Sequence, residues 1–60
     1  MTDEINDAIQ KSIELMQESF DTFRAAEAER SKGNPTAYEA LTAKAFALRA
    51  AAFKLVFPDD

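Results

Sequence analysis

The fold is decided by the stretch from Pro35 to Phe57, which reads PTAYEALTAKAFALRAAAFKLVF. This stretch is rich in alanine, the residue with the highest helix propensity, and it contains no glycine. Pro35 suits the first position of a helix, where a missing N–H costs little, and Pro58 directly after the stretch ends a helix. We therefore expect one helix over residues 35–57.

This helix carries apolar residues on two separate faces, at about 100° of rotation per residue. The first, the leucine stripe, combines leucines with small and aromatic neighbours: Tyr38, Leu41, Ala45, Leu48, Ala52 and Leu55. The second, the phenylalanine face, lies roughly 140° away around the helix and consists of Phe46, Phe53 and Phe57. Because a surface helix normally buries one apolar stripe, two faces require two neighbours. Both sets are therefore predicted to contribute to an oligomer interface.

The chain length also favours association. Sixty residues make one domain with a marginal core, and chains this small are often stabilised by disulfides, metal or oligomerisation. The sequence has no cysteine and no histidine, which removes disulfides and the usual zinc ligands. Oligomerisation remains, so we expect at least a homodimer.

Another amphipathic helix is expected over about residues 3–31, with Thr2 or Asp3 as its cap. Its apolar residues are spaced by threes and fours and form the isoleucine stripe: Ile5, Ile9, Ile13, Met16, Phe20 and Phe23. Beside this stripe run Ser12, Ser19 and Ala26, which are small enough to let another helix approach closely. We expect the isoleucine stripe to pack on the leucine stripe, within one hairpin or between hairpins.

Residues 32–34 form the turn between the two helices. Gly33 can take the left-handed conformation that ends a helix, and Asn34 can cap the next one. An alternative start uses Thr36 and Glu39, which have the spacing of a capping box. Because the connection is short, the helices should run antiparallel. The sequence thus predicts an all-α hairpin that dimerises into a four-helix bundle or a larger helical oligomer, with a short acidic tail over residues 58–60.

The charges argue against two classes of partner. Eleven acidic and seven basic residues give a net charge of −4, whereas nucleic-acid binding normally needs a concentrated basic surface. An oligomer that gathers Arg49 and Lys54 from several chains is one alternative, and an acidic first helix that occupies a basic partner surface is another. No segment has the length and charge-free character of a membrane span, and the acidic start MTDEINDAIQ lacks the order of a signal peptide. We expect a cytoplasmic protein that binds no membrane.

Catalytic chemistry is not expected either. Without histidine or cysteine the commonest general base and the thiol nucleophile are missing. Gly33 is the single glycine, so there is no glycine-rich loop for phosphates. We predict a protein that is not an enzyme and has neither a metal site nor a cofactor.

Two functions fit these features. The expected layout, a short hairpin pairing into an antiparallel bundle, resembles that of small plasmid and phage regulatory proteins, without a matching motif. The first hypothesis is therefore a homo-oligomeric interaction protein that also contacts another protein, as an inhibitor or regulator from a phage or other mobile element. The second is a protein that sequesters a small anionic ligand, such as a nucleotide, at a subunit interface. Its candidate ligand contacts are the cations Arg24, Arg30, Lys44, Arg49 and Lys54. Tyr38, Phe46 and Phe53 would stack on a base.

Overall fold

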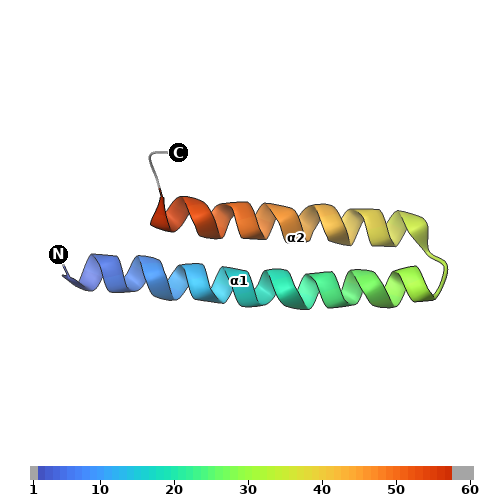
Figure 1. Cartoon of the computed structure of the whole chain (residues 1–60), viewed down its shortest axis with the longest axis horizontal. Helices are drawn as coiled ribbons and strands as arrows, with labels where there is room; N and C mark the ends of the chain where they lie inside the picture. Colours follow the sequence, from blue (N-terminus) through green and yellow to red (C-terminus); the bar gives the residue numbers. More distant parts are fainter. Residues whose placement is uncertain (1, 58–60) are drawn as a thin grey trace.

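Two antiparallel helices make up the described part of the chain (Figure 1). A computed structural model describes residues 2–57, and of Thr2 only the backbone. Helix α1 comprises Thr2–Ser31 and helix α2 comprises Pro35–Val56, so the alternative start at Thr36 is wrong. The structure confirms the predicted all-α helical hairpin. The predicted acidic tail over residues 58–60 and the predicted side-chain cap at Thr2 lie outside the described part. The alternative cap at Asp3 is wrong, because Asp3 lies inside the first turn of α1.

The turn ends α1 by backbone hydrogen bonds. Gly33 has a φ of 81°, in the left-handed region, as predicted. The Gly33 N–H donates to the Arg30 carbonyl at 3.1 Å and the Asn34 N–H donates to the Glu29 carbonyl at 3.0 Å. These are the two bonds of a Schellman motif. The predicted cap by the Asn34 side chain is wrong, because its amide donates instead to the Glu29 carboxylate at 2.8 Å.

The helices meet along a seam of small residues, spaced by threes, fours and sevens as in a heptad pattern. The buried members of this seam are Ser19, Thr22, Ala26, Ala45 and Ala52. The Ser19 hydroxyl donates to the Ala45 carbonyl of the other helix at 2.9 Å, and the Thr22 hydroxyl donates to the Glu18 carbonyl of its own helix at 2.7 Å. Both buried hydroxyls are therefore satisfied. Small side chains at the contact let the helix axes come close together.

Most of the isoleucine stripe does not pack between the helices of one hairpin, contrary to one of the two predicted arrangements, although Met16 and Phe23 are half-buried. Ile13 and Phe20 are 47% and 56% exposed, and Ile9 is similarly exposed. On α1, Ser19 and Phe20 point about 100° apart, so only one of them can face α2. The small residues of α1 face those of α2, and this close approach leaves the bulky neighbours outside. Packing of the isoleucine stripe between hairpins stays a prediction.

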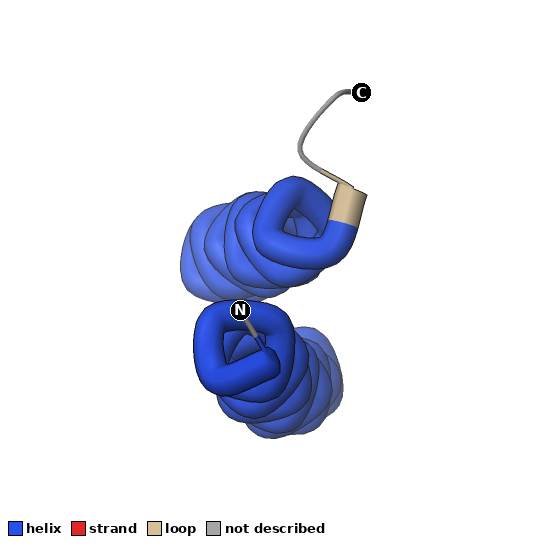
Figure 2. Tube along the Cα trace, turned by 90° about the vertical axis from the view of Figure 1, so that its left-hand side faces the viewer, coloured by secondary structure: helices blue, strands red, loops and turns tan. Residues whose placement is uncertain are grey.

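The hairpin is one helix thick. Its Cα atoms extend over 48 × 19 × 8 Å, and the end-on view shows the two helices as a single layer (Figure 2). Stable domains usually consist of at least two packed layers, because each helix has an apolar stripe to bury. A single layer therefore leaves two broad faces exposed, and the composition of these faces decides what can cover them.

Candidate interaction surface

One face of the hairpin gathers bulky apolar side chains from both helices. The rings of Phe23 in α1 and Phe46 in α2 lie 5.2 Å apart at 88°, the edge-to-face arrangement that aromatic pairs prefer. This contact places the isoleucine stripe and the phenylalanine face on the same side of the seam. We call their union the apolar face, which consists of Ile5, Ile9, Ile13, Met16, Phe20, Phe23, Phe46, Phe53 and Phe57. Most of these side chains are about half exposed.

The apolar face is hollowed near the open end of the hairpin. A hollow of about 260 Å³ is lined by Ser12, Met16, Ala52, Phe53, Val56 and Phe57. The rings of Phe53 and Phe57 lie 6.5 Å apart at 30° along one side of α2. A hollow lined by such groups can receive a bulky apolar side chain, as the central pockets of protein interfaces do.

A cation extends over this face. The guanidinium carbon of Arg49 lies 5.7 Å from the centre of the Phe53 ring, within the range of a cation–π interaction. Long basic side chains can cover apolar surface with their stems while the charged head stays in water. Arg49 therefore lies against an aromatic ring within the apolar face.

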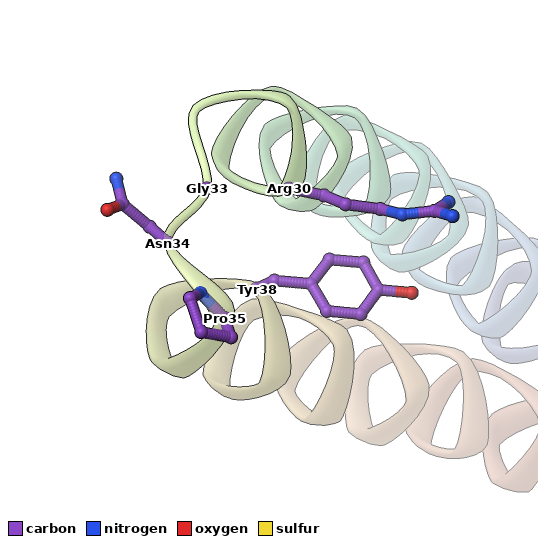
Figure 3. Close-up of a pocket in the computed structure, with 5 residues that line it drawn as sticks. All are labelled: Arg30, Gly33, Asn34, Pro35 and Tyr38. Carbon is purple, nitrogen blue, oxygen red and sulfur yellow. The ribbon is translucent and has the colours of Figure 1, made fainter.

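A second hollow lies at the turn. It measures about 210 Å³ and is lined by Arg30, Gly33, Asn34, Pro35 and Tyr38. Figure 3 shows the Arg30 side chain and the Tyr38 ring side by side, both pointing back along the hairpin, whereas Asn34 points away from them. The Arg30 guanidinium also lies 3.5 Å from the Glu27 carboxylate, at an exposed i,i+3 pair. Its charge is thus partly compensated within α1.

The cations predicted to contact an anionic ligand do not meet within one chain. Arg24 pairs with Asp21 and lies on exposed helix surface, and Arg30 lies at the turn. Arg49 and Lys54 lie on the C-terminal half of α2, toward the open end, and Lys44 is exposed in the first half of that helix. A ligand site built from them at a subunit interface stays a prediction that no contact within one hairpin supports.

The residues predicted for the oligomer interface fall into two groups. The leucine stripe lies toward α1: Ala45 and Ala52 are buried in the seam, Tyr38, Leu41 and Leu48 are half-buried, and Leu55 is more exposed. The phenylalanine face remains outside the seam and exposed. Part of the predicted oligomer interface thus packs within the hairpin, and the rest is free for a partner.

The sequence analysis left open whether the isoleucine stripe packs within one hairpin or between hairpins, and its predicted oligomer-interface residues all lie on α2. A signal for the exposed position of this stripe was present in the matching spacing of the small residues. Ser12, Ser19 and Ala26 are seven apart on α1, and Ala45 and Ala52 are seven apart on α2. Two matched rows of small residues indicate the close contact, and the bulky stripes are then left over on one side.

The described residues show no other recognisable site. Among residues 2–57 there is no group of three or more acidic side chains arranged to hold a metal ion. Neither α1 nor α2 is long and apolar enough to cross a membrane. Comparisons with protein-family models, with curated proteins and with solved structures found no match. The apolar face is therefore the feature of the described hairpin best suited to binding a partner.

Proposed function

We propose that this chain is a small homo-oligomeric interaction protein without enzymatic activity, and that a second copy covers its apolar face to form a four-helix bundle. The observation that carries this proposal is the apolar face itself. Nine bulky apolar residues share one side of a single-layer hairpin, and most of them are about half exposed. Contiguous apolar patches of this kind mark interaction sites on soluble proteins.

The accessible surface area of the chain is larger than expected for a folded monomer, and the difference supports an interface with a second copy. The accessible surface of the chain is 4696 Å². A folded monomer of 6.7 kDa exposes about 3,900 Å² by the scaling of surface with mass. The excess of about 800 Å² equals what each partner contributes to an interface of standard size. One second copy on the apolar face would remove this excess.

The composition of the seam also supports association. The fully buried apolar side chains of the described hairpin are three alanines. At about 0.8 kcal/mol per buried carbon, their methyl groups contribute only about 2–3 kcal/mol. The half-buried leucines add to the stabilisation. Burying the isoleucine stripe and the phenylalanine face would add more, because their side chains are bulkier.

The proposed biological setting is supported only by the resemblance of the expected layout to that of small plasmid and phage regulatory proteins. A hairpin that pairs into a bundle suits a cytoplasmic inhibitor or regulator that binds another protein. Such a protein would be encoded by a mobile element such as a phage. In that case the dimer would present its outer surface to the second protein.

Light scattering on a double variant tests the proposed function. Phe46→Ser with Phe53→Ser should shift the mass from dimer to monomer and lower the melting temperature, because aromatic anchors dominate many interfaces. The matched control is Ala40→Ser with Ala47→Ser, which introduces the same side chains at exposed positions of α2 away from the apolar face. Unchanged mass and melting temperature in the phenylalanine variant would refute self-association through this face. If such a variant lost only its capture of another protein, the face would be a docking surface for that protein.

A further inference from the structure

We propose that the second copy lies with its turn at the opposite end, so that α1 packs antiparallel on the second copy's α1 and α2 packs on its α2. The two-fold axis would cross α1 close to residue 14. This inference rests on the proposed function, because it specifies how two apolar faces meet. Two symmetric arrangements bring the faces together: turns at the same end, or turns at opposite ends. The distribution of charge along the face distinguishes them.

The apolar residues occupy the same stretch of both helices. On α1 they run from Ile5 to Phe23, with the midpoint at residue 14, and on α2 from Phe46 to Phe57, with the midpoint between residues 51 and 52. The hollow on the apolar face is lined by Met16 and neighbouring Ser12 from α1 together with Ala52 and residues near it from α2. The two midpoints therefore lie at nearly the same height, since the hydrogen bond from Ser19 to Ala45 places residue 14 opposite residue 50, within two residues of the α2 midpoint. A two-fold axis through this height superposes most of each apolar stretch on its counterpart in the second copy.

Toward the turn, the same face becomes charged. Glu27 lies seven residues after Phe20 on α1, and Glu39 lies seven residues before Phe46 on α2. Residues seven apart lie on the same side of a helix, so both carboxylates continue the lines of the phenylalanines. Both side chains are exposed. Arg30 pairs with Glu27 at 3.5 Å, which leaves this end of the face with a net negative charge.

The two carboxylates lie at nearly the same height. The hydrogen bond from Ser19 to Ala45 sets the register of α1 against α2. Eight residues beyond Ser19 on α1, Glu27 lies opposite residue 37 of α2. Glu39 is two residues from that position, so the two glutamates differ in height by about 3 Å along the helix axes. With turns at the same end, α1 would face the second copy's α2, and Glu27 would face the second copy's Glu39 at two symmetric places. Like charges across an interface disfavour that arrangement.

With turns at opposite ends, the Glu27 and Glu39 carboxylates lie outside the contact between the two copies. A two-fold axis at residue 14 places Glu27 thirteen residues from the axis, past Ile5 of the second copy. The charged end of each hairpin then extends into solvent while the apolar stretches remain superposed. Apolar overlap is thus available in both arrangements, and the repulsion between Glu27 and Glu39 opposes turns at the same end. With turns at opposite ends, the like charges that remain near the axis are the two copies of Arg49, each lying against its own Phe53 ring.

Disulfide cross-linking tests this arrangement, because the chain has no cysteine of its own. Ile13→Cys places one thiol beside the proposed axis, so mild oxidation should link two identical chains. Glu14→Cys is the matched control, since it lies one residue further along α1, is exposed, and points about 100° away from Ile13, off the apolar face. We expect severalfold more linked dimer for Ile13→Cys than for Glu14→Cys. Met16→Cys, on the other side of the midpoint, repeats the test should Ile13→Cys lose helicity by circular dichroism.

Two results would overturn the inference, and light scattering under the same conditions separates them. If the protein is dimeric but Ile13→Cys chains link to Phe53→Cys chains and not to each other, the turns lie at the same end. The proposed function then stands and the arrangement is wrong. If the mass is that of one folded chain, the apolar face is free or docks another protein, and the proposed function fails together with the inference.

Discussion

The hydroxyl of Ser19 in α1 donates a hydrogen bond of 2.9 Å to the carbonyl oxygen of Ala45 in α2. Both residues are completely buried, and they hold the two helices in register at a point where neither side chain is bulky. The backbones can approach closely there, and this approach directs the isoleucine stripe and the phenylalanine face to the outside. The seam of small residues and the exposed apolar face therefore both result from the close approach of the two backbones.

Loss of the Ser19 hydrogen bond should destabilise the seam less than replacement of Ser19 by a larger side chain. Ser19→Ala should lower the free energy of unfolding by about 0.5–1.5 kcal/mol, the usual contribution of one hydrogen bond. Ser19→Leu should lower it by about 1–3 kcal/mol or more, because no space exists for the larger group. Urea denaturation followed by circular dichroism measures both. Equal stability of the leucine variant and the natural chain would show that the seam is not closely packed.

Gly33 should be difficult to replace. No heavy atom lies within 4 Å of the position that a Cβ would take, so space is not the obstacle. The φ of 81° is the obstacle, because a residue with a Cβ loses roughly 1–2 kcal/mol there. Gly33→Ala should lower the free energy of unfolding by about that amount in urea. Lys32→Ala, at an exposed neighbouring position, is the control, and equal losses in the two variants would contradict the role assigned to the left-handed turn.

Leu48 should contribute less than a fully buried leucine. It is half-buried beside the alanines of the seam, whereas Leu→Ala changes in full cores cost about 2–5 kcal/mol. We expect Leu48→Ala to lower the free energy of unfolding by about 1–2 kcal/mol, since part of the transfer energy is lost and little cavity is left. Thermal or urea unfolding gives the value. A loss of about 4 kcal/mol would mean that a further neighbour covers Leu48 in the assembled protein.

The hairpin follows from signals that are local in the sequence. The alanine-rich stretch, Gly33 with left-handed φ and Pro35 at the helix start each act over a few residues, and all three agree. The pairing of faces is different. Periodicity identifies the stripes on each helix, but Ser19 and Phe20 are neighbours on one helix, and which of them faces α2 depends on how closely the backbones approach. Apolarity alone favours Phe20, whereas the matched rows of small residues favour Ser19, and the structure has Ser19 in the seam.

The measurement that tests the account most directly is the mass of the natural chain in solution at micromolar concentration, by light scattering or sedimentation equilibrium. The central claim is that a second copy covers the apolar face. The account predicts a helical species of twice the chain mass of 6.7 kDa. A fully helical species with the mass of one chain, stable at the same concentration, would contradict it.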